Sequence, residues 1–313
     1  MTMHSVKFAT GKNYRWRLLV LQTLACIMSL NIVAAAEPAP SRADGCARPK
    51  TPSGLVDLGT DDGAGRMRTY RVQAPSNYDA ARRYPVFFVF HGAGGSAANA
   101  ASFGLQRVAG ASGLGIFVFP EGRDFQGQGI GWDDRRDGYD LPFFEHMLRD
   151  LNESYCVNDK QIFAAGFSWG GDFVIALACN RGELLRAVAI NSAVDEFKDV
   201  SDYKTYLGLP CRSERHPALR FEHAVDGDSA YPAPDFATTS QLLRHLNACG
   251  ASAGHPGSSS AGSECSVFSG CAVAVTECSF AKNIGHALPP NWANDTWSFF
   301  VTFLTADRAG TPK

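Results

Sequence analysis

The sequence contains Ser168 and His286, with an aspartate between them in the chain. Serine, histidine and aspartate are the three residue types that together cleave acyl bonds. A serine hydroxyl becomes a strong nucleophile when a histidine takes its proton. An acidic side chain holds that histidine in the correct tautomer and stabilises its charged form. These residues therefore predict acyl transfer through a covalent acyl-enzyme, provided that the fold brings the three side chains together.

The serine lies in the run Gly166-Phe167-Ser168-Trp169-Gly170-Gly171, which contains the pattern G-x-S-x-G. The apolar residues 161–165 before it predict a buried strand, and residues 172–178 after it predict a helix. This context is typical of a nucleophile elbow, a strained turn that lifts the hydroxyl clear of a sheet. The turn needs residues without side chains on either side, which Gly166 and Gly170 provide. The alternative is a glycine-rich turn with an incidental serine.

His286 is the best placed of the eight histidines to act as the base. It lies in a predicted loop between the last strand and the last helix, whereas the other candidates fall in predicted helices, in other loops or within a strand. His91 directly follows a buried strand, in the run His91-Gly92-Ala93-Gly94-Gly95. We expect this turn to supply an oxyanion-hole amide, from Ala93, that complements the amide of Trp169.

Two aspartates can supply the acid, because residues 219–225 predict a strand that runs directly into both Asp226 and Asp228. Each would lie at the carboxyl end of that strand, and each gives the chain order Ser, Asp, His that goes with a nucleophile elbow. Asp195, after the preceding strand, is a third candidate, although the capping of a helix explains it better. The residues alone leave Asp226 and Asp228 open.

Apolar strands alternate with helical segments along the chain, which predicts one α/β domain with a doubly wound, mostly parallel sheet. The expected strands are residues 66–74, 85–90, 115–120, 161–165, 186–190, 219–225 and 273–279, and the expected helices are residues 139–155, 172–178, 236–246 and 292–304. Residues 251–263 are rich in serine, glycine and alanine and predict a loop.

The N-terminus has the pattern of a secretory signal, with basic residues, an apolar run from Leu18 to Val33 and the small residues Ala34-Ala35-Ala36. We expect residues 1–36 to be the signal peptide, 37–53 a flexible lead-in and 54–313 the catalytic domain. The alternative is an uncleaved membrane anchor. With cleavage, we expect an extracellular or periplasmic protein that contacts no membrane.

Eight cysteines remain after the signal, an even number that predicts up to four disulfides in an exported protein. They are Cys46, Cys156, Cys179, Cys211, Cys249, Cys265, Cys271 and Cys278. The last four crowd the segments that lead to His286, so we expect them to pair among themselves. Their spacing matches no zinc site, and we expect neither a metal nor a cofactor. The net charge of −2, with both signs interspersed, argues against a nucleic-acid partner. We expect a monomer.

The chain resembles the secreted feruloyl and acetylxylan esterases of carbohydrate esterase family 1, and their relatives the extracellular poly(3-hydroxybutyrate) depolymerases. The matching residues are Cys46, Tyr70-Arg71-Val72, Pro75-Ser76-Asn77-Tyr78, Phe90-His91-Gly92, Pro120-Glu121-Gly122, Gly131-Trp132, Tyr139-Asp140-Leu141-Pro142-Phe143, Tyr155-Cys156-Val157-Asn158, residues 162–171 and Gly285-His286. The resemblance implies an α/β-hydrolase fold. It also favours Asp228 as the acid, because in this family the acid usually lies four residues before a proline, here Pro232.

Three functions are compatible with these features. The first is a secreted serine esterase that releases hydroxycinnamoyl groups, such as feruloyl, or acetyl groups from plant polysaccharide. The second is a depolymerase of an aliphatic polyester, although such enzymes often carry a further surface-binding domain for which we expect no room. The third is an inactive carbohydrate-binding module. We favour the feruloyl esterase. An aromatic acyl group could stack on Trp132 or on Trp169. Of the two we select Trp132, because we expect the side chain of Trp169 to point into the core.

Overall fold

The computed structural model describes residue 46 and residues 54–195, 213–250, 254–257, 262–280 and 284–304. The described residues belong to one compact unit. The expected signal peptide, the lead-in apart from Cys46, and Cys211 lie outside the described residues. Within the described ranges, no helix is both long and apolar enough to cross a bilayer.

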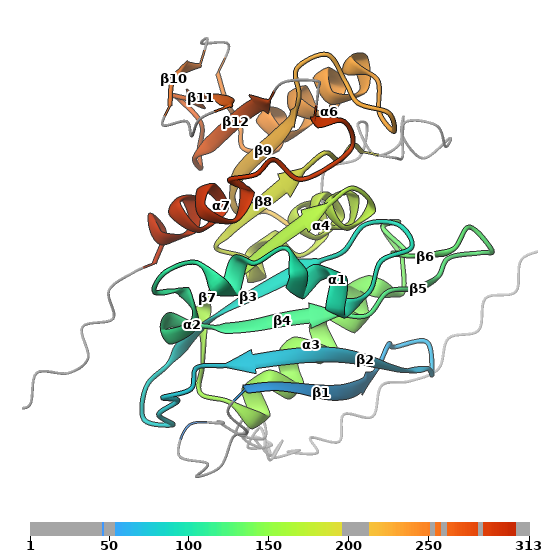
Figure 1. The fold of residues 1–313 in the computed structure, drawn as a ribbon, viewed down its shortest axis with the longest axis vertical. Helices are drawn as coiled ribbons and strands as arrows, with labels where there is room; N and C mark the ends of the chain where they lie inside the picture. The colour runs from blue at the N-terminus through green and yellow to red at the C-terminus, as the bar shows by residue number, and fades with distance from the viewer. Residues whose placement is uncertain are drawn as a thin grey trace, which may run out of the picture. The chain divides into compact units, whose positions relative to one another are not determined.

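A ten-stranded sheet runs through the unit in the order β1-β2-β4-β3-β7-β8-β9-β12-β11-β10 (Figure 1). Its strands are β1 (Gly54–Asp61), β2 (Met67–Ala74), β3 (Tyr84–Phe90), β4 (Ile116–Pro120), β7 (Val157–Phe167), β8 (Ala187–Asn191), β9 (Ala218–Ala224), β10 (His255–Pro256), β11 (Ser263–Phe268) and β12 (Val275–Phe280). The six central strands from β4 to β12 are parallel, and the strands at both ends are antiparallel. This is the predicted α/β-hydrolase architecture, a mixed and mostly parallel sheet in a single domain.

The helices of the described residues lie on both faces of this sheet. They are α1 (Ala97–Ser102), α2 (Ala111–Leu114), α3 (Asp140–Ser154), α4 (Trp169–Asn180), α6 (Ala233–Leu246) and α7 (Trp292–Val301), with short 3₁₀ turns at Leu105–Arg107 and Gly182–Leu184. A separate two-stranded hairpin is formed by β5 (Arg123–Asp124) and β6 (Ile130–Gly131), and it projects from the main sheet in Figure 1.

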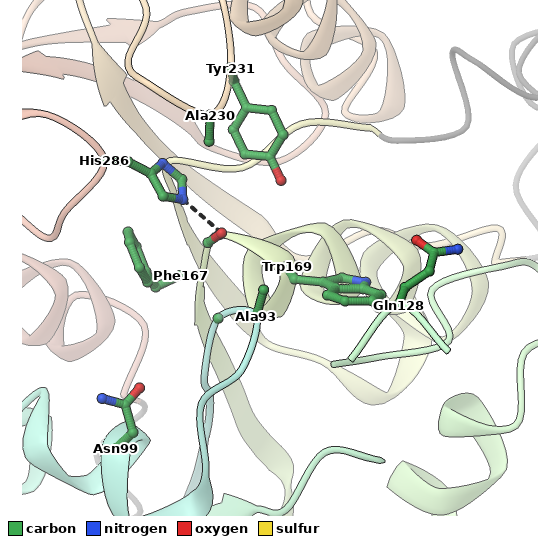
Figure 2. A pocket seen from close by; sticks show the side chains of 10 residues that line it. Ala93, Asn99, Gln128, Phe167, Trp169, Ala230, Tyr231 and His286 are labelled. Carbon is green, nitrogen blue, oxygen red and sulfur yellow. Dashed lines mark hydrogen bonds between the residues drawn. The ribbon is translucent and has the colours of Figure 1, made fainter. Parts of the chain in front are cut away.

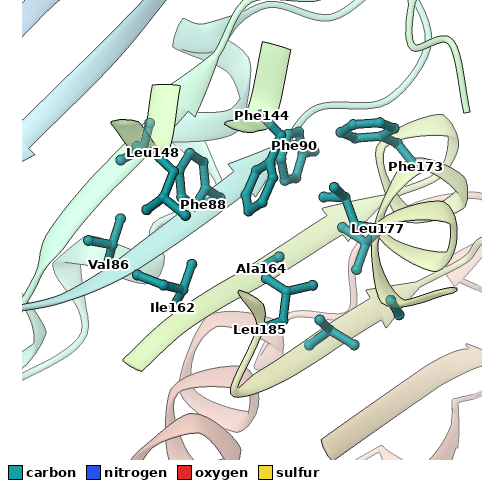
Figure 3. Packing of buried hydrophobic residues seen from close by; sticks show 14 of the residues in the cluster. Val86, Phe88, Phe90, Phe144, Leu148, Ile162, Ala164, Phe173, Leu177 and Leu185 are labelled. Atoms are coloured by element: carbon teal, nitrogen blue, oxygen red, sulfur yellow. The ribbon is translucent and has the colours of Figure 1, made fainter. Parts of the chain in front are cut away.

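Strand β3 shows why the central strands lack polar residues. Val86, Phe88 and Phe90 pack into one core cluster, with side chains from α3 and α4 (Figure 3), while Phe87 and Val89 pack into a second cluster with α1 and α7. Every residue of β3 is buried. A strand covered by helices on both faces must be apolar at each position, which is why the sequence shows no alternation here.

The expected strands and helices are all present, with ends that differ by a few residues. The sequence did not predict β1, β11, the hairpin of β5 and β6, or the short helices α1 and α2. Strand β1 is an exposed edge strand with few buried side chains, and so carries no apolar pattern. The prediction of a loop over residues 251–263 is wrong at two places. His255–Pro256 forms β10, which pairs with β11, and Ser263 is the first residue of β11. These strands form because their backbones pair with a neighbouring strand of the sheet. Such pairing cannot be predicted from local amino-acid composition.

The disulfides confirm the expected pairing of the four C-terminal cysteines among themselves. Cys249 is bonded to Cys271, and Cys265 is bonded to Cys278. The second bond joins directly opposite positions of β11 and β12, the strand that leads toward His286. Cys46 is bonded to Cys156, just before β7, and Cys179 is also disulfide-bonded.

A buried ion pair joins β2 to the start of α3. The guanidinium of Arg68 contacts the carboxylate of Asp140, and both side chains are almost fully buried. Arg68 also donates to the carbonyl oxygen of Glu121, just after β4, at 2.8 Å, and Asp140 accepts the amide of Asp133 at 2.6 Å. Burial raises the pKa of Asp140 to about 6, so its carboxyl group is ionised at neutral pH and neutralises Arg68. These contacts tie the segments after β4 and β6 to the core.

We predict that Asp140→Ala destabilises the protein by about 3–5 kcal/mol, because it leaves the charge of Arg68 buried without a partner. The measurement is the free energy of unfolding in urea at pH 7. The double variant Arg68→Met/Asp140→Leu removes both charges and is expected to be more stable than Asp140→Ala alone. A double variant that is less stable than the single one would contradict this explanation.

Candidate active site

Ser168 lies in a strained turn between β7 and α4. Its backbone has φ of 54° and ψ of −131°, a combination that L-residues rarely adopt. A Cβ atom on Gly166 would lie 2.1 Å from the carbonyl oxygen of Gly170, and a Cβ on Gly170 would lie 2.5 Å from the carbonyl oxygens of Phe90 and His91. Both positions therefore require glycine, as expected for a nucleophile elbow.

The structure brings the predicted serine, histidine and aspartate into one hydrogen-bonded chain. The hydroxyl of Ser168 lies 2.8 Å from Nε2 of His286, as the dashed line in Figure 2 shows. Nδ1 of the same ring lies 2.9 Å from Oδ2 of Asp228. With Nδ1–H donating to Asp228, Nε2 is left to accept the proton of the serine. This geometry can activate a serine nucleophile.

Asp228, rather than Asp226, is the aspartate that reaches His286. The side chain of Asp228 is fully buried, and its second oxygen accepts the amides of Ala230 and Tyr231, each at 2.8 Å. These two bonds fix the carboxylate in the orientation that the imidazole needs. Asp226 is exposed. It precedes the turn in which the amide of Asp228 donates to the carbonyl oxygen of Tyr231.

The turn after β3 lies against the nucleophile, where an oxyanion hole is expected. A Cβ on Gly92 would lie 3.1 Å from the Cβ of Ser168, so the two backbones are in close contact. The amide of Gly94 donates to Ile130 at 2.8 Å, which fixes the turn to β6. In the described part of the chain, the amides of Ala93 and Trp169 donate to no other residue, and both residues line the cavity beside Ser168. Two free donors at this position can stabilise an oxyanion.

His91 holds the oxyanion turn from behind. Its ring is fully buried; Nε2 accepts the amide of Gly122 at 2.9 Å, and Nδ1 lies 2.8 Å from the carbonyl oxygen of Gly92. Burial lowers the pKa of His91 below its ordinary value of 6.5. The neutral ring, with the proton on Nδ1, can both accept from Gly122 and donate to Gly92, which a charged ring could not do.

The structure corrects the expectation that Trp132 stacks on substrate. Trp132 is fully buried between the rings of Phe90 and Phe173, and its indole Nε1 donates to the carbonyl oxygen of His91 at 2.8 Å. Its ring packs in the core and does not line the cavity. The glycine-rich loop beside it suggested an exposed rim, whereas the indole N–H is satisfied by the oxyanion turn and the ring is free to pack inside.

Trp169, which was expected to point into the core, instead lines the cavity. Its indole lies flat against the backbone of β6, since a Cβ on Gly131 would lie 2.3 Å from the indole carbon Cε3. Phe125 packs edge-on against the same indole, with ring centroids 5.8 Å apart. The absence of a side chain at residue 131 leaves the room that this indole occupies.

A cavity of about 440 Å³ lies beside Ser168, and Figure 2 shows side chains that line it. It is lined by Gly92, Ala93, Asn99, Gln128, Phe167, Ser168, Trp169, Ala230, Tyr231 and His286. The sequence did not predict that Asn99, Gln128, Phe167 and Tyr231 line this cavity. For Phe167 and Tyr231, adjacency to the nucleophile and to the acid was a usable signal; Asn99 and Gln128 come from α1 and the hairpin, and only the tertiary fold brings them here.

Tyr231 connects the three loops that carry the reactive residues. Its amide donates to Asp228, its ring packs edge-on against His286 with centroids 5.6 Å apart, and its hydroxyl donates to Asp172 at 3.0 Å. Asp172 lies in the first turn of α4, directly after the nucleophile. The acid, the base and the helix that follows Ser168 are therefore held together by one residue, through its backbone amide and its side chain.

Comparisons with known proteins agree with this geometry. The chain is 26% identical to the probable feruloyl esterase C of Aspergillus clavatus over 295 residues, covering 88% of this chain and 97% of that protein. It is 29% identical to feruloyl esterase C of Emericella nidulans, covering 75% of this chain and 84% of that one. The chain is an esterase related to the fungal feruloyl esterases. No protein-family model matches it.

Solved structures of other esterases share the α/β-hydrolase fold of this chain. The acetyl xylan esterase from Aspergillus awamori superposes with a TM-score of 0.61 at 16% identity, covering 79% of the esterase and all of that chain. A ferulic acid esterase superposes with a TM-score of 0.55 at 17% identity, covering 80% and 98%. The predicted resemblance to feruloyl and acetylxylan esterases is thus confirmed, while the relation to polyhydroxybutyrate depolymerases stays a prediction.

We predict that His91 remains neutral in the native esterase at pH 6.5. Because its pKa is lower in the native state than in the unfolded chain, the unfolded chain binds this proton first as the pH falls. The stability that His91 contributes is complete above pH 6.5 and is lost as the pH falls toward the native-state pKa. Nuclear magnetic resonance of the imidazole gives that pKa directly, and urea unfolding between pH 7 and pH 5 gives the loss of stability.

His91→Gln is the control for this prediction, because glutamine does not titrate. Its stability should depend less on pH than that of the unmodified esterase over the same interval. An imidazole that is already charged at pH 6.5 in the native protein would contradict the assignment.

Proposed function

We propose that this esterase releases hydroxycinnamic acids, such as ferulic acid, from their esters on plant cell-wall polysaccharide. The observation that carries the proposal is the hydrogen-bonded chain of Ser168, His286 and Asp228, which opens into a cavity walled by aromatic rings. Phe167, Trp169 and Tyr231 line that cavity and suit a flat aromatic acyl group. The curated relatives named as feruloyl esterases support the same substrate class.

In the first half of the reaction, Oγ of Ser168 attacks the ester carbonyl carbon while Nε2 of His286 takes the hydroxyl proton. The carbonyl oxygen becomes an oxyanion and accepts hydrogen bonds from the amides of Ala93 and Trp169. Asp228 stabilises the imidazolium that forms. When the intermediate collapses, the bond to the alcohol oxygen breaks, and Nε2 gives its proton to that oxygen.

The second half repeats these steps with water in place of the serine. Nε2 of His286 takes a proton from water, and the resulting oxygen nucleophile attacks the acyl carbon of the acyl-enzyme. The same two amides stabilise the second oxyanion. Its collapse breaks the bond to Oγ of Ser168, which recovers its proton from His286, and the free acid leaves. No step calls for a metal or a cofactor.

Two other substrates suit the same chemistry. An acetylxylan ester has a small acyl group that the cavity admits, and the fold is shared with a solved acetyl xylan esterase. An aliphatic polyester would also contact an apolar wall. The aromatic lining of the cavity favours the hydroxycinnamoyl ester over both, because stacking between aromatic rings adds about 0.5–1.5 kcal/mol to area burial.

We also propose that the protein is secreted as a monomer after cleavage before Glu37, with residues 54–313 as the catalytic domain and no nucleic-acid partner. The disulfides within the described residues support an oxidising compartment. Mass spectrometry of the N-terminus of the exported protein tests the cleavage site.

Asp228→Asn is expected to lower kcat by roughly 10³–10⁴-fold, because an amide cannot hold the imidazole in the tautomer that accepts the serine proton. Asp226→Asn is the matched control, since Asp226 is exposed and lies two residues away. Steady-state kinetics on methyl ferulate provide the measurement, with the unfolding midpoint as a check that both variants are folded. A large loss in Asp226→Asn together with full activity in Asp228→Asn would overturn the assignment of the acid.

The substrate class is tested by kcat/KM for methyl ferulate, for acetylated xylan and for a short hydroxybutyrate oligomer, on the purified protein. We expect methyl ferulate to be preferred because its ring can stack on the cavity wall. A preference of tenfold or more for the oligomer, equivalent to about 1.4 kcal/mol, would replace the proposal with a polyester depolymerase. The same preference for acetylated xylan would replace it with an acetylxylan esterase.

A further inference from the structure

The cavity has two distinguishable ends on either side of Ser168. Figure 2 shows Trp169 and Gln128 on one side of the bond between Ser168 and His286, and Phe167 and Asn99 on the other. Each end therefore combines an aromatic ring with a side-chain amide. An ester that spans the cavity has its acyl group at one end and its alcohol at the other, and the position of the base decides which.

The alcohol must leave on the side of His286, because Nε2 protonates the leaving oxygen. The ring of His286 is flanked by Phe167, with centroids 5.0 Å apart, and by Tyr231. Trp169 instead packs against Phe125 and Gly131, on the hairpin of β5 and β6. The end that contains Trp169 is thus the one remote from the base, and it is left for the acyl group.

Hydrogen bonds within the hairpin fix the backbone that carries Gln128 at this acyl end. The carboxylate of Asp124 accepts the amides of Gly127 and Gly129, at 2.8 and 3.1 Å, and the amide of Gln128 itself donates to Phe125. Gln128 is exposed, and its side-chain amide forms no hydrogen bond with the other described residues. A side-chain amide can both donate to and accept from a hydroxyl group.

We propose that the acyl group lies along the indole of Trp169 and that the side-chain amide of Gln128 hydrogen-bonds a hydroxyl at the far end of an aromatic acyl ring. The sugar then leaves on the side of Phe167 and Asn99. This inference rests on the proposed function and adds to it a preference for ring-hydroxylated over unsubstituted cinnamoyl esters. Gln128 is a specificity-determining residue in this arrangement, and the flat surface of Trp169 positions the ring.

The test compares methyl 4-hydroxycinnamate with methyl cinnamate, two esters that differ only in the ring hydroxyl and share the same alcohol. We expect the unmodified esterase to prefer the hydroxylated ester in kcat/KM. In Gln128→Leu, the ratio of the two kcat/KM values should fall roughly three- to tenfold, the effect of one neutral hydrogen bond. Asn99→Leu, which removes the amide at the opposite end, is the matched control and should keep the ratio of the unmodified protein.

A ratio that falls in Asn99→Leu and not in Gln128→Leu would show that the acyl group occupies the other end and would overturn the inference. An unchanged ratio in Gln128→Leu, or no preference in the unmodified protein, would overturn it as well. These outcomes leave the proposed function intact, since both esters are still cleaved. Failure of the unmodified protein to cleave either ester, with turnover of acetylated xylan or a hydroxybutyrate oligomer, would instead refute the proposed function.

Discussion

The close contact between two backbones at the nucleophile is the constraint on which the site depends. Ser168 holds its strained φ and ψ because β7 and α4 are packed in place by the core on both faces of the sheet. Gly170 lies so close to the carbonyl oxygens of Phe90 and His91 that no side chain would fit. The end of β3 is therefore pressed against the start of α4, and this contact brings the oxyanion turn beside the nucleophile.

The same contact explains why several buried groups serve the site without touching substrate. His91, as a neutral ring, joins the oxyanion turn to Gly122, and the indole of Trp132 fixes the carbonyl oxygen of His91. On the opposite side, Tyr231 links the acid, the base and α4. Reacting groups held by such partners are already in place when charge develops, which is the source of most electrostatic catalysis.

The sequence predicted the sheet, most helices and the cysteine pairing because these follow from local patterns: buried apolar runs, helical periodicity and an even number of cysteines. It also indicated Ser168 and His286, since a G-x-S-x-G turn and a loop after the last strand are local features, whereas Asp228 was chosen over Asp226 by family spacing. The positions predicted for Trp132 and Trp169 were the reverse of those in the structure, where Trp132 is buried and Trp169 lines the cavity. Both residues lie near glycines in the sequence, and only the packing against Gly131 and Phe90 decides which ring is buried. Gln128 and Asn99 could not be predicted, since their place at the cavity depends on segments distant in sequence.

Ser168 is the proposed nucleophile of an acyl-transfer reaction, and covalent labelling tests this role most directly. A fluorophosphonate probe, followed by digestion and mass spectrometry, should modify the peptide that contains Ser168 with one equivalent per protein and abolish ester hydrolysis. Ser168→Ala should take up no label and lose roughly 10⁴-fold or more in kcat. Stoichiometric labelling of a different serine, or full ester hydrolysis by Ser168→Ala in a folded protein, would contradict the account.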